Sequence, residues 1–169
     1  MEADWLLQEL ESEDFFYVVF SHHSLANDFR NRGIVNREVV RALLEKRRVL
    51  FCMNGHDHGE GCTIINGIPY ITLNSMSYIW HGTKKLYSYD AKIHEKYPSL
   101  KDMILYQEPL HAFVEIGEDE VRITGMNGHY QTVTPEDAEI GRMWNGVSIE
   151  PKVSPHILKL TRNNGGQNI

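Results

Sequence analysis

The sequence predicts an α/β fold, and three features of its first half lead to that prediction. Two apolar runs, residues 15–20 and 49–53, each end in a polar turn that contains histidines. The segment between the two runs has its apolar residues at helical spacing. An Asn-Gly pair at residues 66–67 separates two further strand-like runs, which is typical of a tight β-hairpin. A strand–helix–strand unit followed by β-hairpins accounts for these features.

The chain is predicted to begin with a short helix followed by a buried strand. Apolar side chains fall at helical spacing near the start, at Trp5, Leu6 and Leu10. Residues 15–20 are continuously apolar and rich in aromatic and β-branched side chains. Such a run is typical of a strand that is buried on both faces.

A second helix and a second strand are predicted next. Asn36 is suited to cap the helix, because its side chain can accept a hydrogen bond from a backbone N–H of the first turn. Residues 39–44 give this helix an apolar face, and the basic residues 46–48 suit its carboxyl end. Residues 49–53 predict a second buried strand, in which Cys52 is expected to be an inert thiol.

Two hairpins are expected in the rest of the chain. Residues 62–65 and 68–73 flank the Asn-Gly pair, and residues 112–116 and 121–125 flank a polar turn. The segment 151–169 ends in a run rich in Asn and Gly, which predicts a poorly ordered tail. We therefore expect one domain that covers residues 1–150.

Composition narrows the class of protein. The chain has 169 residues and a formal charge of -6, which argues against nonspecific binding to nucleic acid or acidic membranes. A phosphate substrate remains compatible with this charge, since bound divalent cations reverse the local potential. No apolar run approaches the roughly 20 residues that span a bilayer. The acidic start lacks the order of a signal peptide, and Cys52 and Cys62 form no Cys-x-x-Cys pair, so a cytoplasmic location is expected.

Histidines follow both predicted strands. His22 and His23 come after the first strand, and His56 and His58 come after the second, between glycines. The carboxyl ends of strands are where α/β sheets place their active sites. Neutral imidazole suits Mn, Fe, Zn, Ni or Co, so histidine alone does not identify the metal. The alternative for His56 and His58 is a polar turn with solvated imidazoles.

These two motifs resemble the last two metal-binding motifs of the calcineurin-like metallophosphoesterases. That family carries, in order, Asp-x-His, Gly-Asp-x-x-Asp, Gly-Asn-His-Asp/Glu, a lone His typically followed by x-Pro, and Gly-His-x-His. Residues 18–25 are similar to the lone-His element, with Ser24 where the family usually has proline. Residues 54–58 are similar to the closing motif. The resemblance covers residues 3–75 and fades beyond them.

The resemblance implies a fold, a cofactor and a reaction. The family fold is a four-layer α/β/β/α sandwich, and its site holds two divalent metal ions that hydrolyse phosphomonoester or phosphodiester bonds. By position, the resemblance assigns His22 and His56 to one ion and His58 to the other. His23 aligns with a variable position and is expected to line the substrate pocket; the alternative is a register in which His23 takes the place of His22 as the ligand.

The first three family motifs are absent from this chain. In the family they supply the bridging aspartate, an asparagine ligand and the histidine that assists the leaving group, so no catalytic residue is assigned here. We expect the chain to be the C-terminal half of such an enzyme, whether a fragment, a split gene product or a decayed remnant, with little or no activity alone. Such a half exposes a sheet edge that suits a second copy or a complementing chain.

Other polar residues near the motifs have two interpretations each. Asp57 either orients an imidazole or simply forms the turn, and the second is favoured. Ser21 and Asn54 either contact phosphate or cap their turns. Glu60 is expected to face solvent, and His81 to lie in an exposed loop rather than in the pocket.

Overall fold

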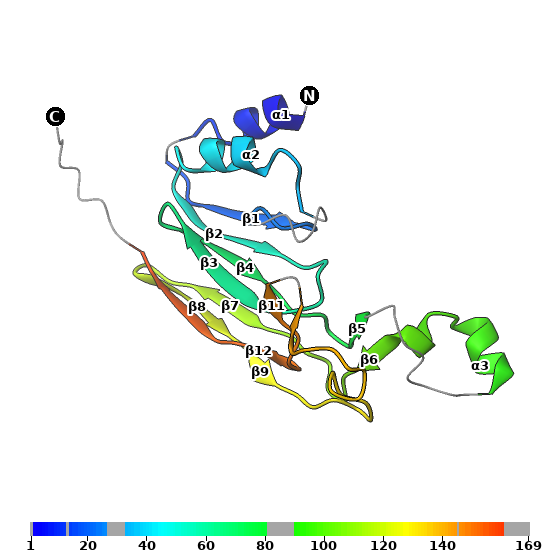
Figure 1. Cartoon of the computed structure of the whole chain (residues 1–169). Coiled ribbons are helices and arrows are strands. Elements are labelled where there is room, and N and C mark those ends of the chain that lie inside the picture. The colour runs from blue at the N-terminus through cyan, green and yellow to red at the C-terminus, as the bar shows by residue number, and fades with distance from the viewer. Residues whose placement is uncertain (1, 13, 27–32, 81–89, 145, 161–169) are drawn as a thin grey trace.

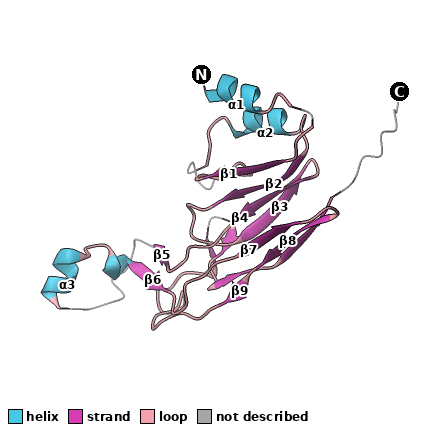
Figure 2. Ribbon diagram, turned by 180° about the vertical axis from the view of Figure 1, so that it is seen from behind, coloured by secondary structure: helices cyan, strands magenta, loops and turns pink. Residues whose placement is uncertain are grey.

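Two β-sheets pack face to face, and two helices cover the outer side of the first sheet (Figures 1 and 2). The computed structural model describes residues 2–12, 14–26, 33–80, 90–144 and 146–160. The described helices are α1 (Glu2–Glu9), α2 (Arg37–Leu44), α3 (Ala91–Lys96) and a 3-10 turn at Leu100–Asp102. None of the helices in these ranges is long and apolar enough to cross a membrane.

The first sheet contains the predicted strand–helix–strand unit and the first hairpin. Its strand order is β1-β2-β4-β3, with β1, β2 and β4 parallel and β3 antiparallel to β4. In the Asn-Gly turn, Asn66 and Gly67 have φ angles of 49° and 83°, as a left-handed two-residue hairpin turn requires. The strands are β1 (Tyr17–Ser21), β2 (Val49–Asn54), β3 (Gly61–Ile65) and β4 (Ile68–Thr72).

Asn36 is the N-cap residue of α2, as predicted, but the expected side-chain hydrogen bond is not formed. Asn36 directly precedes the helix, and its side chain makes no capping hydrogen bond. Its backbone carbonyl instead accepts from the N–H groups of Val39 and Val40. Asn36 therefore begins the helix through its backbone alone.

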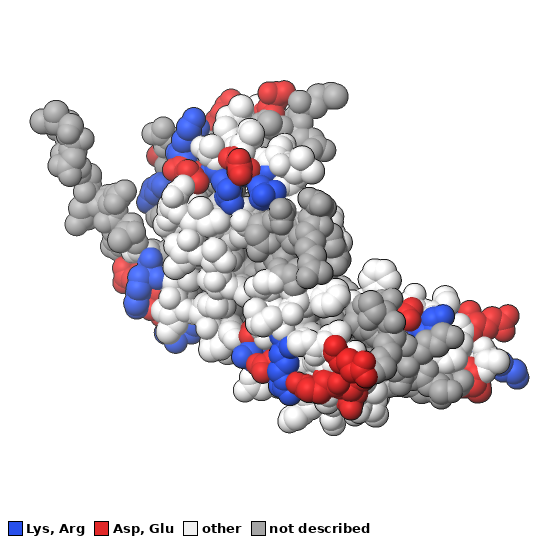
Figure 3. All heavy atoms as spheres, in the orientation of Figure 1, with Lys and Arg blue, Asp and Glu red and all other residues white. Residues whose placement is uncertain are grey.

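The prediction that residues 15–20 form a buried strand is wrong as to burial. β1 is the outer strand of the first sheet and pairs only with β2 among the described residues. Phe20 is 71% exposed, and Phe15 and Phe16 are also exposed. Figure 3 shows charged side chains around α1 and α2, along the left and lower edges of the molecule and on the lobe at the right, with few on the described surface in the middle of the view. By contrast, β2 is buried as predicted, because it has a strand on either side.

The second sheet contains the second predicted hairpin and one strand that was not predicted. Its order is β13-β8-β7, all antiparallel, with β7 (Phe113–Ile116), β8 (Glu120–Thr124) and β13 (His156–Lys159). Val121 and Ile123 of β8 pack against Phe51 and Ile71 of the first sheet. Burial of these side chains joins the two sheets into one core.

The prediction of a disordered tail from residue 151 is wrong for its first part. β12 (Lys152–Val153) pairs with β9, and β13 pairs with β8. Leu158 of β13 packs onto the core between the sheets, which explains why this segment is ordered. Residues 161–169 lie outside the described residues. The domain therefore extends to at least residue 160 instead of ending at residue 150.

A small lobe lies beside the two sheets and carries α3 (Figure 1). A separate apolar cluster, which includes Ile79, Ile104 and Ile149, forms its core. Short two-stranded ladders build this part of the fold: β5 (Tyr78–Trp80) with β6 (Met103–Leu105), β9 (Met126–Asn127) with β12, and β10 (Met143–Trp144) with β11 (Val147–Ser148).

Three layers of the expected four are present. Within the described ranges, no helix covers the outer face of the β13-β8-β7 sheet (Figure 1). The mixed α/β class is confirmed, and the fourth layer stays a prediction.

Candidate metal centre

The predicted motif histidines lie at the carboxyl ends of two neighbouring parallel strands. β1 and β2 pair in register so that Ser21 lies opposite Asn54, the last residue of each strand. His22 and His23 follow the first of these residues, and His56 follows the second after one glycine. The topology therefore brings the two motifs to one edge of the sheet, as the sequence predicted.

Ser21 and Ser24 hold the first histidine loop. The Ser21 hydroxyl donates to the carbonyl of His23 at 2.7 Å, and the N–H of Ala26 donates to the Ser24 hydroxyl at 3.0 Å. Ser24 is fully buried. Of the two interpretations for Ser21, the structure shows turn capping.

The second histidine loop has an unusual backbone. His56 and His58 have φ angles of 53° and 49°, in the left-handed region that residues with a Cβ rarely adopt. The N–H of Asp57 donates to the carbonyl of Gly55 at 2.6 Å, which closes the turn. Asp57 itself is 3% exposed. It is thus a buried part of the turn, whereas both flanking histidines remain partly exposed.

Asn54 links this loop to the next strand. It is 7% exposed, and its Oδ1 accepts from the Thr72 hydroxyl at 3.1 Å. Its Nδ2 donates to the carbonyl of Gly55 at 3.2 Å. The Asn54 side chain therefore holds the start of the histidine loop onto β4.

Three imidazoles gather at this edge. One ring nitrogen from each of His22, His23 and His56 lies within 4.8 Å of the other two. Nδ1 of His56 and Nε2 of His22 are 2.9 Å apart, at hydrogen-bonding distance. The rings of His23 and His56 have centroids 3.9 Å apart. The expectation that His23 lines the pocket did not foresee its place inside this cluster.

His58 lies outside the three-histidine cluster. It lines a cavity that His22 and His56 also line. Its ring packs edge-on against Tyr78, with centroids 4.7 Å apart. The cavity has a volume of about 360 Å³ and an aromatic wall formed by Tyr78, Trp80 and Trp144, next to His22, His56 and His58. The assignment of His58 to a second ion stays a prediction.

The donors fit one borderline metal ion. Imidazole nitrogens are ligands for Mn, Fe, Co, Ni and Zn, whereas Mg and Ca take oxygen. Among the described residues, no carboxylate or cysteine joins the three histidines. The cluster in the described part of the chain therefore contains no carboxylate that could bridge to a second ion.

The prediction that Glu60 faces solvent is wrong. Its side chain is largely buried and joins two distant parts of the chain. Its side chain is only 11% exposed and accepts from the N–H and the hydroxyl of Ser154, at 2.6 and 3.0 Å. Lys152 lies 3.4 Å from the same carboxylate. Because these partners are some 94 residues away in sequence, no local pattern pointed to them. His81 lies outside the described residues.

Cys52 is buried, as the sequence predicted. It is 3% exposed, and burial raises the pKa of its thiol to about 12, so the nucleophilic thiolate is scarce at neutral pH. Cys62 is exposed, and desolvation also raises its pKa. Neither cysteine belongs to the histidine cluster.

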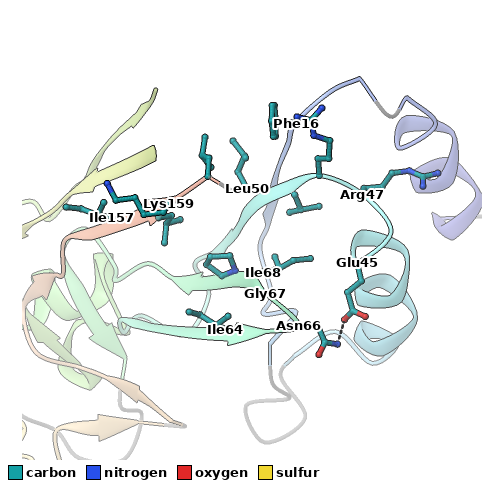
Figure 4. Close-up of a pocket in the computed structure, with 15 residues that line it drawn as sticks. Phe16, Glu45, Arg47, Leu50, Ile64, Asn66, Gly67, Ile68, Ile157 and Lys159 are labelled. Atoms are coloured by element: carbon teal, nitrogen blue, oxygen red, sulfur yellow. Dashed lines mark hydrogen bonds between the residues drawn. The ribbon is translucent and has the colours of Figure 1, made fainter. Parts of the chain in front are cut away.

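A larger cavity, about 740 Å³, opens between the two sheets at the other end of β2 (Figure 4). Leu50 and Ile68 of the first sheet and Ile157 and Lys159 of the second contribute to its walls. At its rim, Asn66 donates to Glu45 at 2.9 Å. None of the described residues that line this cavity is a histidine, so it is separate from the candidate metal centre.

A solved structure of a dimetal phosphatase from Danio rerio resembles this chain. The TM-score is 0.53 and the sequence identity is 18%, over 94% of this chain and 37% of that chain. This likeness shows a shared fold. The chain spans well under half the length of that protein. No protein-family model and no curated protein matches the sequence.

Proposed function

We propose that this chain is the metal-binding half of a metal-dependent phosphoesterase that hydrolyses phosphomonoester or phosphodiester bonds. One observation carries the proposal: the imidazoles of the two predicted metal motifs meet at the carboxyl ends of adjacent parallel strands. The fold shared with a dimetal phosphatase supports it. His22 and His56 would hold one ion, and His58 a second.

Each part of the site has a role in this proposal. His22, His56 and His58 would hold the divalent ions, which would supply Lewis-acid chemistry at the phosphoryl group. The aromatic side chains Tyr78, Trp80 and Trp144 exclude water from one side of the cavity and position the organic part of the substrate. The substrate class is a phosphate ester, and the described residues do not select among such esters.

The missing ligands lead to a second element of the proposal, a complementing polypeptide. Among the described residues, the cluster contains no carboxylate and the outer edge of β1 has no partner strand; Phe20 on β1 and Phe16 just before it are exposed. The cavity between the sheets (Figure 4) is a further gap in the sandwich. We propose that a polypeptide bearing the carboxylates pairs with β1 and completes the four layers, and that the chain alone has little or no turnover.

The test uses inorganic phosphate, which is the product common to phosphomonoesterases, as a ligand. We expect the chain loaded with Mn²⁺ to bind phosphate and the metal-free chain not to bind it, as measured by calorimetry. The His56→Ala variant should lose this binding. Equal phosphate binding with and without Mn²⁺ would contradict the proposed function.

The same preparation tests the claim about activity. With Mn²⁺ and bis(p-nitrophenyl) phosphate, the chain alone should show no turnover above that of the His56→Ala variant. Turnover that disappears in the His58→Ala variant would show instead that this chain is sufficient for catalysis.

A further inference from the structure

The geometry points to a three-imidazole site in which His23 joins His22 and His56, so that this chain alone binds one transition-metal ion. The inference rests on the proposed function for its assumption that the motif histidines bind metal. It differs in the ligand set: His23 is a ligand rather than a pocket residue, and His58 is not needed for the first ion.

The distances between the histidine ring nitrogens are close to those of a tetrahedral metal site. A tetrahedral site with metal–nitrogen bonds of about 2.0–2.1 Å places its ligand nitrogens about 3.3 Å apart. In the cluster, the nitrogens of all three histidines lie within 4.8 Å of one another, and one pair is 2.9 Å apart. Rotation of one or two imidazoles about their side-chain bonds is enough to close the remaining difference.

The backbone around His23 is already fixed. The Ser21 hydroxyl holds the His23 carbonyl, and buried Ser24 anchors the next residues. On the other side, the left-handed backbone of His56 sets the position of the second loop. A backbone fixed before binding reduces the entropy lost when the ligands are ordered, which favours metal affinity.

His58 is separated from the cluster by the buried residue Asp57. Its ring lies against Tyr78, and its nitrogens are not among those that gather with His22, His23 and His56. Three imidazoles with an open fourth position are the donor set of a reactive zinc site. Loading of the two proposed ions is therefore sequential: the first binds to this chain, and the second requires ligands from the complementing polypeptide.

Calorimetric titration of the metal-free chain with Zn²⁺ tests the ligand set. We expect one Zn²⁺ per chain, and a Kd that rises at least about 10-fold in His23→Ala, as in His22→Ala. His111→Ala, an exposed histidine outside the cluster, should stay within about 2-fold of the parent chain. His129→Ala, an exposed histidine paired with Glu108 elsewhere, controls for nonspecific binding.

Folding is checked separately, so that lost binding is not lost structure. His23→Gln keeps a polar side chain of similar size, and its circular dichroism and urea midpoint without metal should match those of the parent chain. Weak Zn²⁺ binding by this folded variant supports the inference. Tight binding by His23→Gln, or an equal loss in His111→Ala and His22→Ala, overturns it.

The two proposals fail differently. If Zn²⁺ binds through His23 but the metal-loaded chain does not bind phosphate, the three-imidazole site stands and the phosphoesterase proposal falls. If phosphate binding depends on metal and on His58 while His23→Gln changes nothing, the ligand set proposed here falls and the phosphoesterase proposal stands.

Discussion

At the scale of single residues, two of the motif histidines in the loop after β2 have a strained backbone conformation. His56 and His58 both occupy the left-handed region without being glycine. Such positions cost roughly 1–3 kcal/mol each and tend to occur at functional sites, where surrounding contacts hold them. The contacts here are the Asn54 side chain and the burial of Asp57.

The strain predicts a difference between two substitutions at position 58. Glycine adopts a φ of 49° without a Cβ penalty, whereas alanine does not. We therefore expect His58→Gly to be more stable to unfolding than His58→Ala by about 1 kcal/mol. Urea denaturation of the two variants measures this difference. Equal midpoints, or a more stable alanine variant, would contradict it.

The sequence placed the histidines on loops after strands, but it could not give their mutual distances. His22 and His56 were found through motifs that are local in sequence. The meeting of His23 with His56 depends on the register that sets Ser21 opposite Asn54, and on how each loop turns. Register between strands separated by a helix is set by tertiary packing, so the three-histidine cluster was not predictable.

At the scale of elements, strands joined by a local turn were predicted correctly, whereas a strand that depends on pairing with a distant part of the chain was missed. The hairpin of β3 and β4 follows from Asn66 and Gly67 alone. β13 was missed because it depends on pairing with β8, far away in sequence, and because the Asn- and Gly-rich end dominated the composition of the last 19 residues. The burial of β1 was overestimated because an apolar run does not reveal how many neighbours a strand has.

The close approach of β9 and β12 gives an element-scale prediction. A Cβ added at Gly125 would lie 1.9 Å from the Val153 carbonyl oxygen, so the backbone must move to admit it. We expect Gly125→Ala to destabilise the chain by about 1–3 kcal/mol. Gly141→Ala is the matched control, since nothing lies within 4 Å of a Cβ there.

Chemical denaturation of both variants provides the measurement. The urea midpoint should fall in Gly125→Ala and stay near that of the parent chain in Gly141→Ala. An unchanged midpoint for Gly125→Ala would mean that the ladder between Val153 and Met126 does not constrain this position.

At the scale of the whole molecule, the first sheet has an open side. No described strand pairs with the outer edge of β1, and Phe20 on this strand is 71% exposed. Exposed apolar edge strands pair with other chains, whether a proper partner or further copies of the same chain. In the absence of the proposed complementing polypeptide, the chain is therefore expected to self-associate through β1.

A charge on the edge should reduce that association. We expect Phe20→Lys to lower the concentration-dependent increase in sedimentation coefficient, because edge lysines oppose strand pairing. Trp5→Lys is the control, since Trp5 is also exposed, at 60%, but lies on α1 rather than on the edge. If both variants associate as the parent chain does, β1 is not the contact.

The contact between Glu60 and Ser154 can form only late in synthesis, although Glu60 lies next to the histidine loop. It follows the histidine loop directly, yet its carboxylate is held by Ser154, 94 residues later in the chain. A ribosome makes His56 and His58 long before it makes Ser154, and contacts so distant in sequence form late. The nascent chain therefore carries its histidines on a loop that Ser154 does not yet hold at Glu60, and this contact forms only after residue 154 has emerged.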